Sequence, residues 1–215
     1  MSVFKKNKYY KYIFVLLATF ALMSCGFGPN GDIGGGGNCV GSGNTGICLA
    51  IDSISPQNIS GGYSDAVDMY QSTCLEGEEY TPEPFGASDA EIVISATVVD
   101  GVDPDVVSSK ITLTGYTWTF ALTGGTGPYF QLQTLPVPFT IAQNGTYTFS
   151  AAMVTNQMKN TFGYDEWFNN IYTFGYDYYP MYVVEYTFYG VDDNFNEVSA
   201  TRSTYVTLGA FDNCP

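Results

Sequence analysis

The sequence predicts an all-β protein, and three observations support this. From about residue 51 onward, apolar and polar residues alternate with a period of two, as they do in half-buried strands. Thr, Tyr, Val and Phe dominate these segments, and Asp, Asn and Gly lie at the joints between them. No long amphipathic helical pattern is present. We therefore expect about seven antiparallel strands in two sheets that pack face to face.

The first clearly alternating segment is "AEIVISATVVD". One face of this segment carries four apolar side chains, Ile92, Ile94, Ala96 and Val98. The next segment, "KITLTGYTWTFAL", changes parity in its middle. Leu113 belongs to one apolar parity and Tyr116 to the other, with Gly115 at the change. This predicts a β-bulge, because one extra residue reverses the side to which the following side chains point.

Three later segments also have the pattern of strands. In "GTYTFSAAM", Tyr147, Phe149 and Ala151 alternate with hydroxyl-bearing residues. The segments "MYVVEYTFYG" and "NEVSATRSTYVTLG" flank a polar joint at Asp192-Asp193-Asn194 and predict a β-hairpin. The expected apolar face of this hairpin comprises Tyr182, Val184, Tyr186, Phe188, Val198, Ala200, Val206 and Leu208.

The strand order, with Trp118 in the third strand, resembles that of immunoglobulin-like or fibronectin-like modules of bacterial envelope proteins. The resemblance covers Asp65 to Leu208 and implies an immunoglobulin-like antiparallel β-sandwich of about seven strands. The chain departs from true immunoglobulin domains because its second strand has no cysteine to form the bridge under Trp118. The segment "TPEPFGASDAEIVISA" is also similar to envelope lipoproteins of no assigned activity, and this likeness implies no activity here.

An aromatic-rich insertion precedes the penultimate strand. Ten of the 21 residues from Phe162 to Tyr182 are aromatic, and the word TFGYD occurs twice. A sandwich needs only a short turn at this point, so the insertion either packs over the sandwich or forms a recognition surface. Rings with a polar tip are enriched at binding surfaces, and the expected accessible ones are Tyr164, Trp167, Tyr176 and Tyr178.

The N-terminus predicts export and lipidation. A lysine-rich start is followed by "YIFVLLATFALMS", an apolar run too short to span a bilayer and typical of a signal peptide. The run ends in Leu22-Met23-Ser24-Cys25-Gly26, which resembles the lipobox of bacterial lipoproteins. The resemblance implies a signal peptide over 1–24, a lipidated Cys25 as the membrane anchor, and an outer-membrane location, because Gly26 rather than Asp follows. The side of the membrane stays open.

Composition divides the remaining chain into a tether and a domain. Residues 25–50 are rich in Gly and Asn and predict a flexible tether, and residues 51–215 are expected to form the sandwich domain. Without the signal, the chain keeps Lys110, Lys159 and Arg202 against 21 acidic residues, a formal net charge of −18. Nucleic-acid binding requires bases that neutralise phosphates, so nucleic acid is excluded as a partner.

Four cysteines remain besides the lipidated one, and they are Cys39, Cys48, Cys74 and Cys214. An even number of cysteines in an exported chain predicts two disulfides. Of the three possible pairings, we favour Cys39–Cys48 with Cys74–Cys214. A zinc site fits less well, because the chain contains no His and no CxxC pair.

Groups that could perform catalysis are few. Without His there is no Ser-His or Cys-His pair, and disulfides would remove thiolate chemistry. Asp165, Glu166 and Asp177 lie among rings that could stack on sugars, so a carboxylate-based glycosidase is the enzymatic alternative. We expect neither an enzyme nor a cofactor.

Two acidic turns are weak calcium candidates. "DGVDPD" contains Asp100, Asp103 and Asp105, and "DDNFNE" runs from Asp192 to Glu197. Calcium takes six to eight oxygen ligands, but Asp and Asn also cap ordinary turns. The second run lacks the glycine that an EF-hand loop needs at its sixth position. We therefore expect ordinary turns.

Together these features predict a non-enzymatic outer-membrane lipoprotein with a binding or assembly role, acting through the aromatic insertion on an envelope protein or a glycan. Two further alternatives remain open. One is a carbohydrate-binding module that uses Trp167 and Trp118. The other is an accessory subunit of a larger surface complex.

Overall fold

A computed structural model describes residues 46–59, 62–70, 73–76, 79–82, 86–99, 107–124, 127, 129–161, 179–209 and 211, all within a compact unit spanning 35–215. The elements, in chain order, are β1 (Ile47–Pro56), β2 (Ala66–Asp68), β3 (Thr73–Glu76), β4 (Glu79–Pro82), β5 (Ser88–Val98), β6 (Lys110–Leu122), β7 (Gln133–Ala142), β8 (Gly145–Val154), α2 (Asn156–Thr161), β9 (Met181–Asp192) and β10 (Glu197–Gly209). The prediction of an all-β fold is confirmed.

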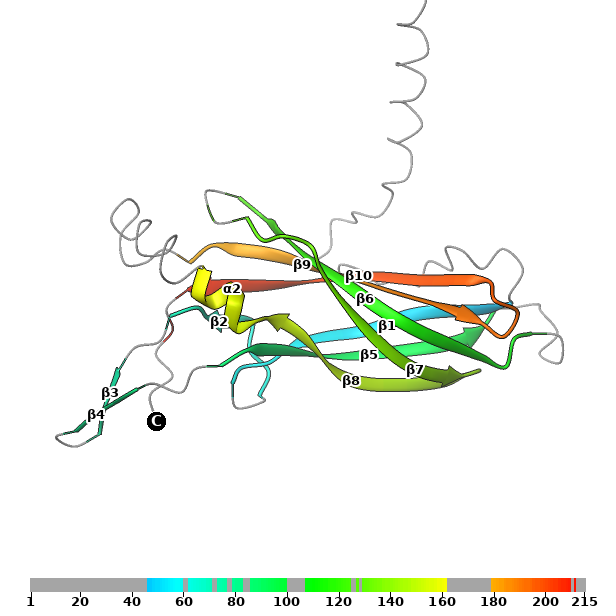
Figure 1. Ribbon diagram of the computed structural model, residues 1–215, viewed down its shortest axis with the longest axis horizontal. Coiled ribbons are helices and arrows are strands. Elements are labelled where there is room, and N and C mark those ends of the chain that lie inside the picture. The colour runs from blue at the N-terminus through cyan, green and yellow to red at the C-terminus, as the bar shows by residue number, and fades with distance from the viewer. Residues whose placement is uncertain are drawn as a thin grey trace, which may run out of the picture. The chain divides into compact units, whose positions relative to one another are not determined.

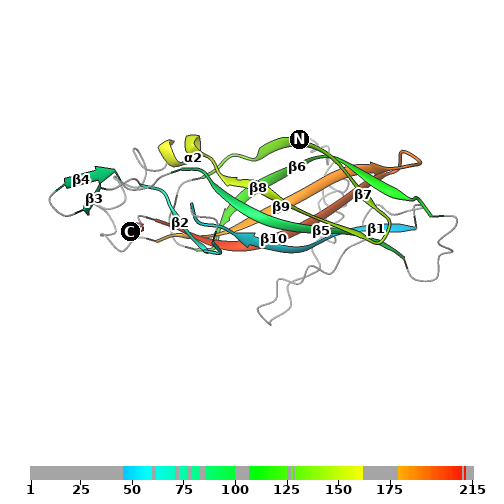
Figure 2. The same ribbon diagram turned by 90° about the horizontal axis from the view of Figure 1, so that it is seen from below.

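Two long, curled sheets lie one over the other (Figures 1 and 2). One has the strand order β1-β5-β8, and the other has the order β2-β10-β9-β6-β7. The β3–β4 hairpin forms a separate two-stranded sheet that stands apart from the two large ones in Figure 1. The pairs within the large sheets are antiparallel except for β2 with β10, which is parallel and departs from the expected all-antiparallel arrangement.

The predicted strand faces agree with the structure on most of the long strands, but on β8 the predicted apolar face is buried at Ala151 and exposed at Tyr147. Ile92, Ile94 and Ala96 on β5 are fully buried, while Val98 at the end of this face is half-buried. The apolar faces of β9 and β10 are buried as well. The hairpin across Asp192-Asp193-Asn194 is confirmed by a continuous β9–β10 ladder. The bulge is confirmed as well, since the register of β6 shifts between Leu113 and Gly115 against both of its neighbours.

Aromatic side chains join the two sheets through their polar tips. The Trp118 indole Nε1 donates a hydrogen bond to the carbonyl of Met153 at 2.8 Å, and the Tyr186 hydroxyl donates to the carbonyl of Ala152 at 3.1 Å. The amide of Ala152 in turn donates to the hydroxyl of Tyr116 at 3.0 Å. β8 is an edge strand of its sheet as described, and these three side chains from β6 and β9 give its main-chain groups hydrogen-bond partners from the other sheet.

The structure corrects one expectation at this point. Trp118 is only 2% exposed and stacks in the core beside Tyr116 and Tyr186. A buried indole with its N–H bonded internally cannot stack on a sugar, so the suggested carbohydrate-binding role of Trp118 is wrong.

Five strands, β1, β2, β3, β4 and β7, lie outside the segments that the sequence predicts as strands, and β1 and β7 are the long ones among them. β1 begins at Ile47, inside the stretch assigned to the tether, and its register shifts at Asp52. Arg202 on β10 donates to the carbonyls of Ile51 and Asp52 at this irregularity. β7 contains Pro136 and Pro138, and it is an edge strand, which is where a sheet tolerates residues that lack an N–H.

Candidate binding surface at the β9–β10 turn

Most of the predicted site residues lie outside the described residues. These are Cys25, Cys39, Cys214, Tyr164, Trp167, Tyr176, Tyr178, Asp165, Glu166, Asp177, Asp100, Asp103 and Asp105. Their roles stay predictions. Cys48 on β1 and Cys74 on β3 are buried, and their favoured partners belong to the undescribed set, so the pairing also stays a prediction.

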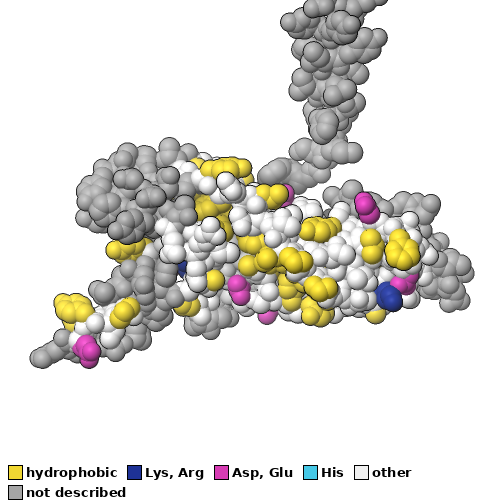
Figure 3. All heavy atoms as spheres, viewed as in Figure 1, with side chains coloured by type: hydrophobic (Ala, Val, Ile, Leu, Met, Phe, Trp, Pro, Cys, Tyr) yellow, Lys and Arg dark blue, Asp and Glu magenta, His cyan; other side chains and the backbone are white. Residues whose placement is uncertain are grey.

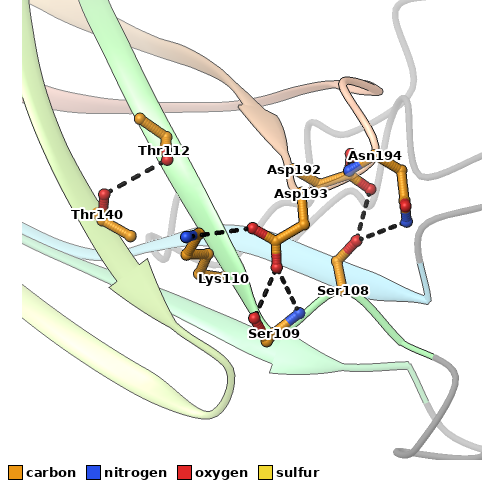
Figure 4. A network of polar contacts seen from close by, with 8 residues as sticks. All are labelled: Ser108, Ser109, Lys110, Thr112, Thr140, Asp192, Asp193 and Asn194. Carbon is orange, nitrogen blue, oxygen red and sulfur yellow. Dashed lines mark hydrogen bonds and ion pairs between the residues drawn. The ribbon is translucent and has the colours of Figure 1, made fainter.

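The turn between β9 and β10 is organised by one carboxylate. Asp192 accepts hydrogen bonds from the amides of Asn194 and Asn196, each at 2.8 Å, from the Asn196 side chain at 3.0 Å, and from the Ser108 hydroxyl at 2.8 Å. Ser108 precedes β6, so this carboxylate ties the turn to a neighbouring segment of the chain (Figure 4). Loss of hydration raises the pKa of Asp192, but the hydrogen bonds from Asn196, Ser108 and Asn194 outweigh it and hold the pKa below 3.8.

A second carboxylate repeats this connection. Asp193 accepts hydrogen bonds from the amide of Ser109 at 3.0 Å and from its hydroxyl at 2.6 Å, and it forms an ion pair with Lys110 at 3.5 Å (Figure 4). The hydrogen bonds from Ser109, aided by Lys110, lower the pKa of Asp193. Both acids therefore act as turn and strand connectors, which favours the structural interpretation of "DDNFNE" over the calcium interpretation.

Phe195 is the exception in this well-satisfied turn. Its amide donates to the carbonyl of Asp192 at 3.1 Å, and the amide of Asp192 donates to the carbonyl of Asn196 at 3.0 Å. This pattern is a tight turn followed by a residue in the left-handed region, and Phe195 has a φ of 61°. Glycine usually occupies that position, because a side chain there costs about 1–2 kcal/mol. The Phe195 side chain is nevertheless 85% exposed.

A surface hollow of about 440 Å³ begins directly behind this turn. Its lining comprises Thr114, Tyr189, Gly190, Val191, Glu197, Val198 and Ser199. Val191 and Glu197 are the cross-strand pair that follows the turn, so the hollow and the turn are continuous.

Two glycines allow the close backbone approach at the β6 bulge. A Cβ added at Gly190 would meet the β6 main chain, including the Cα of Leu113 at 2.8 Å. A Cβ added at Gly115 would lie 2.7 Å from the hydroxyl of Tyr189. The Tyr189 side chain therefore covers Gly115 on the outer side of the sheet, as aromatic residues do for cross-strand glycines.

The outer face of the five-stranded sheet continues this surface with hydroxyl groups. Thr134, Thr117, Thr187 and Thr201 lie opposite one another on β7, β6, β9 and β10. The hydroxyls of Thr187 and Thr201 are 2.9 Å apart. Such a row is typical of the solvated side of an antiparallel sheet. Figure 3 shows scattered hydrophobic side chains and few charged ones on the face that it presents.

The three bases beyond residue 24, Lys110, Lys159 and Arg202, are engaged in the structure of the chain itself. Lys110 pairs with Asp193, and Arg202 binds the two carbonyls on β1. Lys159 on α2 is buried, with 3% of its surface exposed. The surface at the β9–β10 turn thus combines aromatic rings, hydroxyls and carboxylates. The base near this turn is Lys110, and it already forms an ion pair with Asp193.

Comparisons with known proteins assign no identity. No protein-family profile and no curated protein sequence matches the chain. One solved structure, a crystal structure of a structural-genomics target, is 10% identical over 75% of this chain and 86% of that one, with a TM-score of 0.34. Another, the solution structure of a protein named as a late embryogenesis abundant (LEA) candidate, is 9% identical over 75% of each chain, with a TM-score of 0.35. Likenesses this distant support no assignment.

No helix among the described residues is long and apolar enough to cross a membrane. Sequence reasoning found the turn but missed Phe195. The available signal was a lone large apolar residue in an otherwise polar turn, at a position where glycine or asparagine is expected. The hollow was not predictable, because it forms where Gly190, Tyr189 and the β6 bulge meet.

Proposed function

We propose that this chain is a lipid-anchored protein of the bacterial outer membrane that binds another envelope molecule and catalyses no reaction. Cys25 would carry the lipid, residues up to the start of β1 would serve as the tether, and the all-β unit, as a variant of the immunoglobulin-like sandwich, would present the binding surface. The observation that carries the binding role is Phe195, a large apolar side chain that is exposed at a strained position of a firmly bonded turn.

The carboxylates around this turn support binding rather than catalysis. Asp192 and Asp193 both have lowered pKa values and accept hydrogen bonds from fixed neighbours. A general acid at neutral pH needs a raised pKa, so neither residue is poised for that role. Aromatic rings are, in contrast, enriched at recognition surfaces, and polar groups usually form the rim around them.

The test is the recovery of the native lipoprotein from its own cells. Envelopes would be cross-linked with a reversible amine- and carboxyl-reactive reagent, solubilised in mild detergent, and purified through a C-terminal tag. We expect a partner in a fixed molar ratio and loss of membrane retention in a Cys25→Ser variant. Recovery of the protein alone, with no partner protein and no bound glycan, would contradict the binding role. Retention of a glycan without a protein would favour the carbohydrate-binding alternative.

A further inference from the structure

Phe195 combines two properties that folding alone does not explain. Its backbone lies in the left-handed region, where a bulky residue is strained, and its ring is 85% exposed, so burial within this chain does not offset the strain. Glycine would relieve the strain, and little buried surface would be lost. A residue that folding disfavours points to a role in binding.

The turn also holds Phe195 in a fixed place. The Asp192 carboxylate bonds to the residues on both sides of Phe195, namely Asn194 and Asn196, and Asp193 is bonded to Ser109. A turn whose backbone is already ordered loses little backbone freedom on binding, which favours affinity. The ring is therefore presented in the manner of an interface anchor.

The surroundings indicate the chemistry of the partner. Asp193 and Glu197 are exposed beside Phe195, and the nearby Lys110 already pairs with Asp193. An anionic lipid surface would be repelled by these carboxylates. A second copy would bring the same acidic groups against them. A protein pocket with an apolar floor and a Lys- or Arg-bearing rim complements both the ring and the charges.

We infer that Phe195 is the anchor by which this chain docks into an apolar pocket of a partner protein, whose basic rim faces Asp193 and Glu197, while the hollow behind the turn receives part of that rim. The inference rests on the proposed binding role. It adds the class of partner and the residue that makes the central contact.

The first experiment separates folding from binding. In full-length protein, Phe195→Gly should raise the unfolding temperature by about 2–8 °C, because relief of left-handed strain is worth a few degrees in a chain of this size. The same variant should recover at least tenfold less of the co-purifying partner, as expected when an anchor is lost. Tyr129→Ser is the control, since Tyr129 is equally exposed on another loop. That variant should leave recovery of the partner unchanged.

The second experiment locates the contact. A photoreactive benzoylphenylalanine replaces Phe195 in living cells and, as a matched control, replaces Thr201 on the exposed face of β10. We expect an adduct from position 195 whose cross-linked peptide lies in an apolar pocket flanked by Lys or Arg. Adducts only with lipid or with a second copy of this chain would overturn the inference. If a partner co-purifies but position 195 forms no adduct with it, the proposed binding role is supported and the inference that Phe195 makes the central contact is wrong.

Discussion

The tyrosine hydroxyls that reach β8 provide a sharp test of how the two sheets are joined. Replacing Tyr186 with Phe removes the hydroxyl that donates to the carbonyl of Ala152 and leaves the ring in place. A buried main-chain group without its partner costs about 1–3 kcal/mol. Ala152 is half-buried, so the lower part of this range applies and we expect a loss of about 1–2 kcal/mol. For a chain of this size, that corresponds to a fall in unfolding temperature of about 2–8 °C.

The assay is thermal unfolding followed by near-ultraviolet circular dichroism, with Tyr205→Phe on the exposed face as the control. Tyr116→Phe should cost a similar amount, because it removes the acceptor of the Ala152 amide. Both hydroxyls serve the same residue, so the double variant should lose less than the sum of the two single losses. A Tyr186→Phe variant as stable as the control would refute the view that side-chain hydroxyls satisfy the β8 edge.

The pH dependence gives an independent check on Tyr186. Burial raises the pKa of the Tyr186 hydroxyl well above the ordinary value of 10.0. In the unfolded chain this hydroxyl ionises near pH 10, whereas in the folded chain it keeps its proton. Above pH 10 the unfolded state therefore binds fewer protons, and stability falls as the pH rises. The wild type should lose stability above pH 10 more steeply than Tyr186→Phe does.

Three further predictions concern the turn, the bulge and β1. Asp192→Asn should be less stable than the wild type at pH 7. This difference in stability should shrink as the pH falls below about 3.8, because the pKa of the Asp192 carboxylate is lowered in the folded state and its stabilisation is lost on protonation. Urea unfolding at a series of pH values measures the difference. Gly190→Ala should destabilise by about 2–3 kcal/mol, because the new methyl group meets the main chain of β6, while Gly124→Ala, with open space around it, should be neutral in the same assay. Arg202→Met should cost about 1–2 kcal/mol in chemical unfolding, since two carbonyls on β1 lose a charged donor.

Each of these predictions has a result that would contradict it. A pH-independent difference between Asp192→Asn and the wild type would show that the Asp192 charge contributes nothing to the turn. Equal stabilities of Gly190→Ala and Gly124→Ala would show that β6 and β9 can separate at the bulge without cost. An Arg202→Met variant with wild-type stability would show that water replaces the guanidinium at the β1 carbonyls.

The parts of the fold that could be predicted are those in which local pattern and tertiary burial agree. β9 alternates along its whole length, and β5 and the two ends of β10 alternate for most of theirs, because one side faces the other sheet. Gly115 marked the bulge because the parity of the apolar residues changes there. β7 was missed because Pro136 and Pro138 are evidence against a strand unless its edge position is known. β2 has three residues and owes its existence to pairing with β10, which no local signal reveals.

The candidate surface was only half predictable for a related reason. The acids of "DDNFNE" are visible in the sequence, and their ordinary role as turn caps is what the structure shows. The significance of Phe195 depends on its φ and on its exposure, and neither quantity can be read from residue types. Trp118 shows the converse error. From its residue type alone, Trp118 could stack on a sugar ring. Its burial and the hydrogen bond from its indole N–H to the carbonyl of Met153 show that it belongs to the core.

The edges of the two large sheets bear on how a partner can bind. In one sheet, the main-chain groups of Ala152 and Met153 on the edge strand β8 are hydrogen-bonded to side chains from the other sheet. The opposite edge strand, β1, is irregular, and one of its carbonyls accepts a hydrogen bond from Arg202. In the other sheet, the edge strand β7 contains two prolines and the edge strand β2 is only three residues long. Each of these features discourages the addition of a foreign strand. Recognition by strand addition requires a regular edge with free donors and acceptors, so these features disfavour it at the positions where they occur. We therefore expect the proposed binding to use side chains presented by turns and faces, as in the proposal for Phe195, whose turn has main-chain groups held by Asp192.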